Sequence, residues 1–489
     1  MPSKSAIESA AANPDRPGKT SGPWTIPAVY LLLFLLCITS YHGIRDNYLF
    51  NDDFSWLREA RYEMSADNIL TYRVVDFFRP LVNVSFYVIE HLSPGNIPLH
   101  YSLNLALHFL NCVLVFLIFR SLIEDRITSA AAAALFAVTS VHTGAVLWIS
   151  ARTTLLSSFF LMASIAVMVS PSGGKRFKPA ISAVLYVLAL SAKETAIAGL
   201  PIMAMIHFLR RRESRENAPG PAAVLAAAAV TIVYLIVRWE LMGGYVRENW
   251  GPGLHFLRNA AGGFLYQIYV WPLVSLIPSL PSSIPAPTHP FIPEIAVVPA
   301  ILLIIWIGGS KRKLVEMVIA LGWTVLALLP AAAFRYRFFS TESITQNRYY
   351  YLSSAGSVLI IAILLSMLYR SGSRLLKTVS ILVFILSCVG YIVRIDRLEK
   401  KWEHFTGMYE YNIDMILEEV GSPGPTSTLA IENPPLAFPY IEDALVLEHP
   451  GWRIVEITGG REEALGFRPC FYITYSDGFP SEMRIEKLL

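Results

Sequence analysis

Residues 24–43 read WTIPAVYLLLFLLCITSYHG, a run that contains no Asp, Glu, Lys or Arg. About 20 apolar residues are enough for a helix to cross the roughly 30 Å hydrocarbon core of a membrane. The polar segment 1–23, which carries Lys4, Arg16 and Lys19, precedes this run. Because the run lacks a small-residue cleavage site, we expect a retained signal anchor behind a cytoplasmic tail, 1–23.

The composition of the whole chain agrees with this first run. Of 489 residues, 54% are hydrophobic and only 16% are charged, whereas soluble domains carry about 25% charged residues. Similar apolar runs recur along the chain, so we predict a polytopic all-α membrane protein with about 11 to 13 transmembrane helices. The candidate spans are 24–43, 99–119, 128–147, 152–169, 180–192, 195–209, 221–239, 260–279, 294–309, 315–333, 352–369 and 377–394.

The sequence argues against a disulfide-stabilised fold and against nucleic-acid binding. Three of its cysteines (Cys37, Cys112 and Cys388) lie in apolar runs and Cys470 lies near the C-terminus, which does not indicate a disulfide framework. No basic domain, zinc-finger spacing or nucleic-acid motif is found, so no nucleic-acid partner is expected.

Short basic loops predict the orientation, because Lys and Arg concentrate in cytoplasmic loops. Such loops lie at 175–178, 210–215, 311–313 and 370–377. With the N-terminus also inside, the loop 44–98 faces outward. The apolar stretch 180–209 is interrupted by Lys193 and Glu194 and has basic loops at both ends. It therefore predicts a hairpin of two short helices, with Lys193 and Glu194 near the outer face.

The number of crossings decides where the C-terminal segment lies. The loop containing Arg348 and the basic loop 370–377 require that either 260–279 or 294–309 be re-entrant or interfacial, and the sequence leaves both alternatives open. An odd number of crossings places 396–489 outside the cytoplasm. Residues 396–420 have a helical, amphipathic pattern, and 452–458 and 470–475 resemble strands. We thus expect a transmembrane domain at 24–395 and a small extracytoplasmic α+β domain at 396–489.

On this topology, the ionisable residues at membrane level gather on the outer side. Each costs about 2.5–3.5 kcal/mol at the centre of a helix on insertion scales, so such residues are functional candidates. The set is Asp52, Asp53, Arg79, His142, Arg152, Lys193, Glu194 and Arg348.

Several of these residues have two interpretations. Asp52 and Asp53 follow the first span closely, where one of them is placed to act as a general base at the membrane surface and either suits a helix N-cap. Lys193 and Glu194 either neutralise each other or leave Lys193 free to bind a phosphate. Arg348 lies in an aromatic belt with Tyr349, as a snorkelling side chain or as a bidentate phosphate ligand.

The second span carries a polar stripe. Its members recur at helical spacing, which favours interhelical hydrogen bonds over substrate contact. They are His100, Asn104, His108 and Asn111.

The ordered motifs over residues 45–355 resemble the GT-C class of membrane glycosyltransferases, and within it the protein O-mannosyltransferases, especially the transmembrane and TPR-containing group and its bacterial relatives. The motifs are Asn51-Asp52-Asp53, Phe78-Arg79-Pro80-Leu81, Leu135 to Val146 with His142, Trp148 to Arg152, Ser191-Ala192-Lys193-Glu194-Thr195 and Asn347-Arg348-Tyr349-Tyr350.

This resemblance implies a GT-C fold and a polyprenyl-phosphate monosaccharide as sugar donor. It implies that Asp52 is the catalytic base of the Asp52–Asp53 pair, and that Lys193 and Arg348 hold the lipid phosphate. The remaining motif residues are expected to bind substrate: Arg79, His142, Arg152, Glu194 and Tyr349. No metal ligand and no cofactor are assigned, although two adjacent carboxylates leave a divalent metal open.

The sequence departs from that group in two places. Thr139-Ser140-Val141 precedes His142 where relatives have a His-Pro-Val sequence, and no TPR repeat follows residue 395. The acceptor, whether lipid, glycan or protein, therefore does not carry over from the resemblance. A bacterial inner membrane with the active site on its periplasmic face is the expected location. A lipid-linked substrate transporter or flippase, and a non-catalytic scaffold, are the alternatives.

Overall fold

We describe a computed structural model of the chain. The described residues are 25–74, 77–123, 125–171, 176–213, 220–241, 254–272, 306, 309, 311–333, 344–421, 427–434, 438–467, 471–475 and 483–488.

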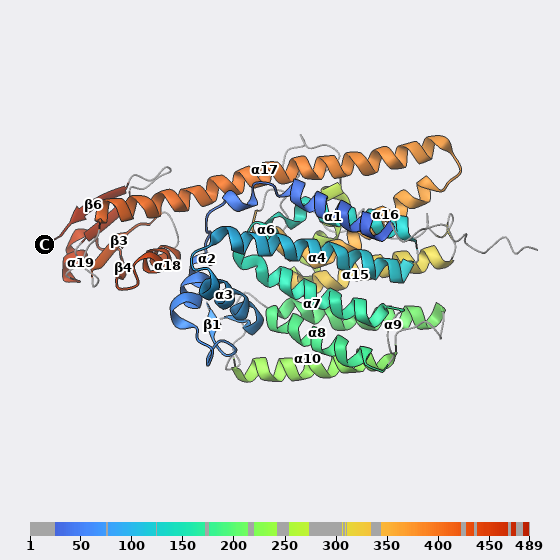
Figure 1. Ribbon diagram of the computed structural model, residues 1–489, viewed down its shortest axis with the longest axis horizontal. Coiled ribbons are helices and arrows are strands. Elements are labelled where there is room, and N and C mark those ends of the chain that lie inside the picture. The colour runs from blue at the N-terminus through green and yellow to red at the C-terminus, as the bar shows by residue number, and fades with distance from the viewer. Residues whose placement is uncertain are drawn as a thin grey trace, which may run out of the picture.

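The membrane part is a bundle of long helices whose axes run in one common direction (Figure 1). Each predicted span coincides with helical structure as far as it is described; residues 273–279 of the span 260–279 and most of the span 294–309 lie outside the described residues. The helices are α1 (Thr25–Ser40), α4 (Ile97–Ile123), α5 (Arg126–Val138), α6 (Thr143–Val146), α7 (Arg152–Val169), α8 (Lys178–Ala192), α9 (Gly199–Glu213), α10 (Pro221–Leu241), α11 (Leu254–Leu265), α15 (Lys311–Ala332), α16 (Tyr351–Tyr369) and α17 (Arg374–Val420).

Length and apolar content make this a multi-pass integral membrane protein. Among the described residues, six helices are long and apolar enough to cross a membrane, and a seventh span forms if α5 and the following turn, which bend by 47°, count as one. The outer faces of the bundle remain apolar: α10 exposes Leu225, Ile232 and Trp239. Such faces suit contact with lipid rather than water.

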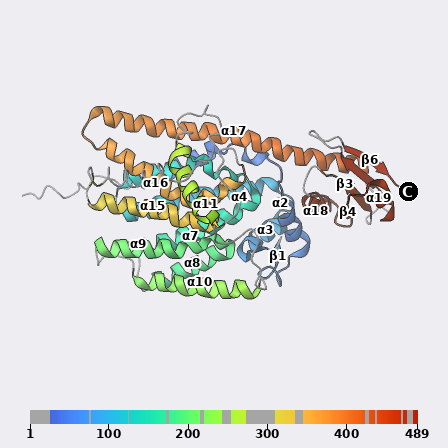
Figure 2. The same ribbon diagram turned by 180° about the vertical axis from the view of Figure 1, so that it is seen from behind.

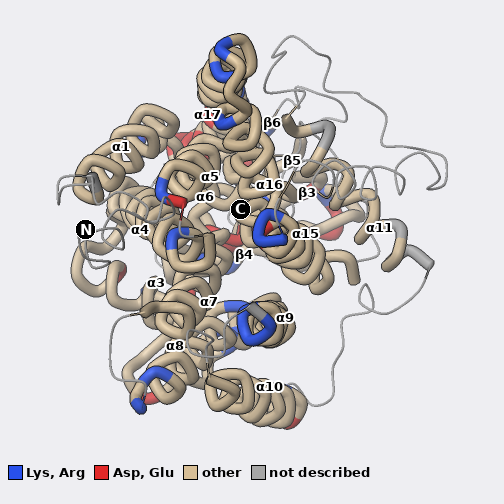
Figure 3. Tube along the Cα trace, turned by 90° about the vertical axis from the view of Figure 1, so that its right-hand side faces the viewer, with Lys and Arg blue, Asp and Glu red and all other residues tan. Residues whose placement is uncertain are grey.

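The basic helix ends lie together at one end of the bundle. Arg210 of α9 donates to the carbonyl of Leu122 at 3.3 Å, and Arg312 of α15 donates to that of Ile123 at 2.9 Å. Arg370 pairs with Asp125 at 2.8 Å. Figure 3 shows these basic ends on the face turned to the viewer. The structure therefore agrees with the predicted hairpin at 180–209, because α8 starts and α9 ends at this face.

The segment 254–272 packs near the opposite end of the bundle. Asn259 donates to the carbonyl of Ala332, the last residue of α15, at 3.3 Å, and Ser353 near the start of α16 donates to Gln267 at 3.0 Å. Figure 2 shows α15 and α16 with α11 against them. Residues 273–279 and most of 294–309 lie outside the described residues, so the choice between 260–279 and 294–309 as the re-entrant or interfacial segment stays a prediction.

The loop 44–98 forms a cap over the end of the bundle remote from the basic face. It contains α2 (Asp53–Arg58), the helical turn η4 (Glu59–Glu63), a two-stranded hairpin of β1 (Arg73–Val74) and β2 (Phe77–Phe78), and α3 (Pro80–Leu92). In Figure 1 this cap lies between the bundle and the C-terminal strands.

Helix α17 joins the bundle to the C-terminal domain without interruption. The predicted span 377–394 and the predicted amphipathic helix 396–420 are one helix of 47 residues, which ends where Gly421 takes a φ of +69°. Its last turns supply Ile416 and Val420 to the core of the C-terminal domain. The C-terminal domain is therefore joined to the membrane bundle by a continuous helix whose last turn packs in the domain core.

The C-terminal domain is a small α+β unit, as the sequence predicts. Its sheet has the order β4-β3-β5-β6, in which β3 pairs in parallel with β4 and β5, and β6 pairs antiparallel with β5. Leu429, Ile431 and Ile473 of the sheet pack against Ile441 and Leu445 of α18. The elements are β3 (Thr428–Glu432), α18 (Phe438–Glu448), β4 (Arg453–Ile457), α19 (Gly460–Gly466), β5 (Phe471–Tyr475) and β6 (Met483–Lys487).

Candidate active site

Asp52 and Asp53 lie at the start of α2, and their side chains have different surroundings. Asp53 is fully buried, and one of its oxygens accepts hydrogen bonds from the backbone amide of Ser150 at 2.7 Å and from the Ser150 hydroxyl. Its other oxygen accepts from the Phe50 amide at 3.0 Å. Asp53 thus fastens the turn to the segment that precedes α7.

Asp52 has no comparable anchor to the segment before α7 among the described residues. Its side chain accepts no hydrogen bond from the first turn of α2, so the helix N-cap interpretation is not supported for this carboxylate. Its Oδ1 atom is buried and has no hydrogen-bond partner among the described residues. A buried oxygen without a donor is costly, and it is available to a proton on a bound substrate.

The electrostatic surroundings of the pair are mixed. Burial raises the pKa of Asp52, and the positive charges of Arg348, Arg79 and Lys193 partly offset this. Burial and then the neighbouring Asp52 raise the pKa of Asp53 to about 8. Both carboxyl groups therefore hold protons more strongly than exposed aspartates, which is the direction required of a base that works near neutral pH.

Asn51, directly before the pair, has an unusual backbone conformation. Its φ is +50°, in the left-handed region, which asparagine tolerates better than most residues. Its side-chain oxygen accepts a hydrogen bond from Tyr409 of α17. Strained backbone of this kind is typical of functional sites.

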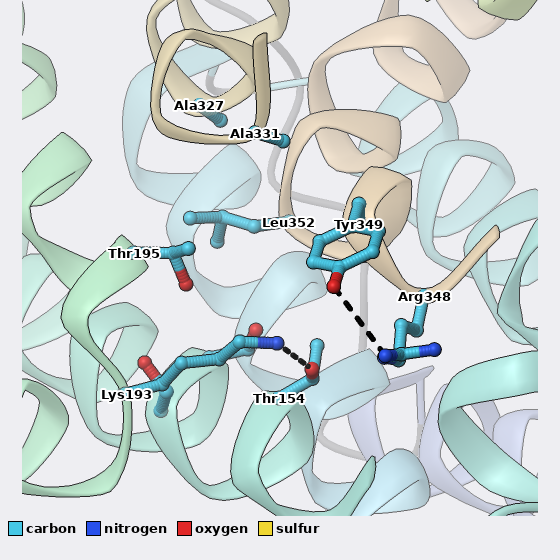
Figure 4. A pocket seen from close by; sticks show the side chains of 10 residues that line it. Thr154, Lys193, Thr195, Ala327, Ala331, Arg348, Tyr349 and Leu352 are labelled. Carbon is cyan, nitrogen blue, oxygen red and sulfur yellow. Dashed lines mark hydrogen bonds between the residues drawn. The ribbon is translucent and has the colours of Figure 1, made fainter. Parts of the chain in front are cut away.

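Lys193 and Arg348 line a pocket next to this turn. Its lining includes the polar residues Thr154, Ser157, Ser158, Lys193, Thr195, Arg348 and Tyr349 and the apolar residues Ala327, Ala331 and Leu352. Figure 4 shows Lys193 and Arg348 approaching from opposite sides, with Thr154 between them.

Both cations are held by neutral groups. The Lys193 ammonium donates to the Thr154 hydroxyl at 2.7 Å and lies 5.2 Å from the centroid of the Tyr349 ring. Arg348 donates to the Thr345 carbonyl at 2.6 Å, and its guanidinium lies over the Trp148 ring at 4.2 Å. Within the described part of the chain, neither cation forms an ion pair with a carboxylate, so both charges can meet an anion.

Glu194 forms its ion pair with Arg79 rather than with Lys193. Its carboxylate pairs with Arg79, at 3.1 Å and 3.3 Å from the guanidinium. The backbone of Lys193 is extended, with φ −161° and ψ 136°, between α8 and the turn η7 (Glu194–Ala198). The chain therefore turns the two neighbouring side chains to different partners, and Glu194 and Arg79 satisfy each other beside the pocket.

Two predicted site residues lie away from the pocket. The His142 ring is buried, its Nε2 atom is 2.7 Å from the Ser354 hydroxyl, and it packs at 4.4 Å from Tyr351. Arg152 is also fully buried and donates to Asn104 at 3.0 Å and to the His100 carbonyl at 3.1 Å. The structure brings together the charges of Asp52, Arg79, Lys193 and Arg348, but places His142 and Arg152 in helix-to-helix contacts.

The predicted polar stripe on the second span makes interhelical hydrogen bonds, as expected. Asn104 donates to the Trp148 carbonyl at 2.9 Å, and Asn111 donates to the Leu155 carbonyl at 3.2 Å. His108 contacts the Tyr351 hydroxyl at 2.9 Å.

Metal-ligating side chains form one compact group among the described residues, and it excludes Asp52 and Asp53. The group is Cys37, His108 and Cys112, inside the bundle. His108 uses Nε2 to donate to the Ala137 carbonyl at 3.1 Å and Nδ1 to meet Tyr351. Because both ring nitrogens are occupied, these contacts explain His108 without an ion.

Sequence reasoning missed three residues that build the site. Ser150 anchors Asp53, Thr154 holds Lys193, and the Trp148 indole donates to the Phe50 carbonyl at 3.2 Å while its ring lies under Arg348. Ser150 and Trp148 lie inside the motif that ends at Arg152, and Thr154 follows that motif by two residues, so their proximity in sequence was the available signal.

Comparison with known proteins shows the fold. ArnT from Cupriavidus metallidurans, in a crystal structure bound to undecaprenyl phosphate, superimposes with a TM-score of 0.53 and 11% sequence identity, over 93% of this chain and 94% of that one. The archaeal oligosaccharyltransferase AglB from Archaeoglobus fulgidus, in complex with an inhibitory peptide and a dolichol-phosphate, gives a TM-score of 0.49, 13% identity and coverage of 92% and 69%. The chain has the GT-C fold, and this prediction is confirmed.

Sequence similarity is narrower. The Drosophila melanogaster protein O-mannosyl-transferase Tmtc1 is 35% identical over 158 residues, which are 31% of this chain and 18% of that protein. The chain thus matches less than a fifth of the length of this curated relative. No family model matches the chain.

Proposed function

We propose that this protein is a glycosyltransferase that moves a sugar, mannose or another hexose or pentose, from a polyprenyl-phosphate carrier to an acceptor hydroxyl. The observation that carries the proposal is the proximity of a buried carboxylate oxygen on Asp52 to two cations, Lys193 and Arg348. Among the described residues, that oxygen has no hydrogen-bond partner and neither cation has a carboxylate partner. The GT-C fold and the short match to an O-mannosyltransferase support the same reaction class.

The chemistry follows from the charges. Asp52 takes the proton of the acceptor hydroxyl, the acceptor oxygen bonds to the anomeric carbon, and the bond from that carbon to the phosphate oxygen breaks. The lipid phosphate then gains negative charge, which Lys193 and Arg348 stabilise through charge-assisted hydrogen bonds. The leaving group needs no protonation, so one carboxylate is sufficient.

The pocket suits the head of such a donor. Its lining combines cations and hydroxyls with the apolar side chains of Ala327, Ala331 and Leu352. A lipid phosphate also has a charged end and an apolar end. The donor would therefore lie with its phosphate between Lys193 and Arg348 and its first isoprene units along α15.

The location is part of the proposal. The site lies at the end of the bundle opposite the basic helix ends, which the positive-inside rule assigns to the cytoplasm. We therefore propose an extracytoplasmic active site, on the periplasmic face of a bacterial inner membrane. A flippase would instead be expected to carry its charges at mid-membrane on interrupted helices related by a repeat.

The test compares Asp52 with its neighbour and with a matched acid. Purified protein would be offered polyprenyl-phosphate hexoses and pentoses with a labelled sugar, and release of free polyprenyl phosphate measured. Asp52→Asn should lower kcat by about 10²–10⁴-fold, the usual contribution of a general base. Asp67→Asn, an exposed acid in the same loop, should leave kcat unchanged. Undiminished turnover by Asp52→Asn would refute the assignment.

The acceptor and the sugar need a second measurement. Mass spectrometry of envelope glycans, lipids and proteins, from cells with the wild-type gene and with Asp52→Asn, should reveal a product that loses one sugar in the variant. Identical profiles, with the variant protein present in the membrane, would count against a transferase and favour the transporter or scaffold alternatives.

A further inference from the structure

Helix α17 contacts the turn that carries Asp52, although the two are about 350 residues apart in sequence. The Tyr409 hydroxyl donates to the side chain of Asn51, and the Thr406 hydroxyl accepts from the Tyr48 amide at 3.4 Å. The Phe50 ring lies 4.9 Å from that of Trp402 and 5.3 Å from that of Tyr409. One face of α17 therefore lines the turn from Tyr48 to Asn51.

The C-terminal domain holds the other side of the same turn. Asp443 of α18 is buried and accepts from Arg58 of α2 at 2.7 Å and from the Ser55 hydroxyl. One turn further along α18, the Leu447 carbonyl accepts from Tyr62 at 2.9 Å. Figure 1 shows α18 beside α2, between the cap and the sheet.

These contacts surround Asn51, the residue of the cap whose backbone has a positive φ. Only Asn51 and Asn433 have positive φ among the non-glycine residues that the structure describes. Such a conformation persists when surrounding contacts over-determine it. Tyr409 meets Asn51 on one side of Asp52, and Asp443 holds α2 on the other side, so the two contacts bracket the proposed base.

We propose that Tyr409 and Asp443 are positioning residues, through which α17 and the C-terminal domain hold Asp52 in its reactive orientation. This inference rests on the proposed function, because it assigns a role relative to that base. It gives the C-terminal domain a part in catalysis rather than in recruitment alone.

The test uses full-length protein in lipid nanodiscs and two conservative variants. Tyr409→Phe removes one hydroxyl, and Asp443→Asn removes one charge. Each should lower kcat about 5- to 30-fold and leave KM for the polyprenyl-phosphate sugar unchanged, because the Lys193–Arg348 pocket is untouched.

Matched controls lie in the same domain, away from α2. The Tyr472 hydroxyl donates to Glu432 within the sheet. Tyr472→Phe and Glu432→Gln remove a tyrosine–carboxylate bond of the same kind, and should leave kcat and KM unchanged. Melting temperatures of all four variants separate lost positioning from lost folding.

The pH profile distinguishes positioning from a reduced amount of folded enzyme. A smaller active fraction scales kcat/KM equally at every pH. A displaced Asp52 gains solvent, so the inflection of kcat/KM should move about 0.5–1 pH unit toward the ordinary carboxyl range. If Asp443→Asn fails to fold, Tyr409→Phe alone carries the test.

The outcomes separate this inference from the proposed function. If Asp52→Asn abolishes transfer while Tyr409→Phe and Asp443→Asn keep wild-type kcat and pH profile, the positioning role is wrong and the function stands. If Asp52→Asn stays active, the function itself is wrong. A fall in kcat that tracks the melting temperature in all four variants would also overturn the positioning role.

Discussion

Two clusters of charged residues at the end of the bundle covered by the loop 44–98 differ in how their charges are matched. In the first, Arg61 pairs with Glu90 at 2.8 Å, Glu90 contacts His100 at 3.0 Å, and Arg152 contacts the other nitrogen of that ring at 3.0 Å. In the second, Lys193 and Arg348 meet hydroxyl and carbonyl groups and no carboxylate among the described residues. The first cluster is built to hold helices together, and the second is open to an anion.

This difference shows that a charge at membrane level is not by itself a sign of catalysis. Both clusters contain motif residues of the resemblance, Arg152 in the first and Lys193 in the second. Only the partners of each side chain separate them. The predictions below test this separation, from the largest expected effect on free energy to the smallest.

The matched cluster should control stability. Glu90→Gln leaves Arg61 without its buried partner, and breaking a buried pair in this way costs about 3–5 kcal/mol. We expect a lower melting temperature and lower yield in detergent, measured by intrinsic fluorescence or size-exclusion chromatography. The exposed pair Arg461–Glu486 provides the control, because Glu486→Gln there should change stability little. Equal losses of stability in Glu90→Gln and Glu486→Gln would show that the first cluster has no special stabilising role.

The open cluster should control transfer and not stability. Lys193→Gln and Arg348→Gln each remove one charged hydrogen bond to the proposed phosphate, worth about 1.5–3 kcal/mol. We expect kcat/KM to fall about 10- to 150-fold with an unchanged or higher melting temperature, since no carboxylate loses its partner. Arg348→Lys keeps the charge but loses the planar fork, and should recover part of the loss. A large fall in melting temperature would show that Lys193 and Arg348 stabilise the fold, as the residues of the first cluster do.

The pH dependence of activity and of stability should run in opposite directions. Asp52 must be ionised to act as a base, and its pKa is raised, so kcat/KM should fall about tenfold per pH unit below that pKa, about 1.4 kcal/mol per unit. Asp53 has a folded-state pKa of about 8, above its unfolded value. The folded state therefore holds this proton more tightly, and its stabilising effect is lost as pH rises through about 8.

Melting curves between pH 5 and pH 9 test the second half of this prediction. Wild-type protein should lose stability toward the alkaline end, and Asp53→Asn should reduce that slope to the part contributed by Asp52, whose pKa is also raised. An undiminished slope in Asp53→Asn would show that Asp53 does not cause it.

Much of the fold was predictable because it follows from apolar length and the placement of basic loops. The His100–Asn111 stripe was also predicted correctly, since helical spacing places these residues on one face. The continuity of α17 across residue 395 was not predicted. The amino-acid composition changes there from apolar to polar, which suggested a boundary between two elements, but the helix itself does not end.

The motifs predicted that certain residues gather in a candidate site, but not which partner each side chain contacts. The motifs gave Asp52, Asp53, Lys193 and Arg348, but adjacent residues in a sequence do not reveal which way each side chain turns. Glu194 faces Arg79 because Lys193 is extended, and Asp53 rather than Asp52 meets Ser150. The contacts of Tyr409 and Asp443 join regions that no local pattern connects.

The length of α17 has a geometric consequence for the acceptor. At 1.5 Å per residue, 47 helical residues extend about 70 Å, of which the hydrocarbon core of a bilayer takes about 30 Å. The rest of its length extends past the bundle and ends in the C-terminal sheet. Because α18 of that domain packs on α2, the domain covers this side of the loop 44–98, and the proposed acceptor would have to approach Asp52 from another side.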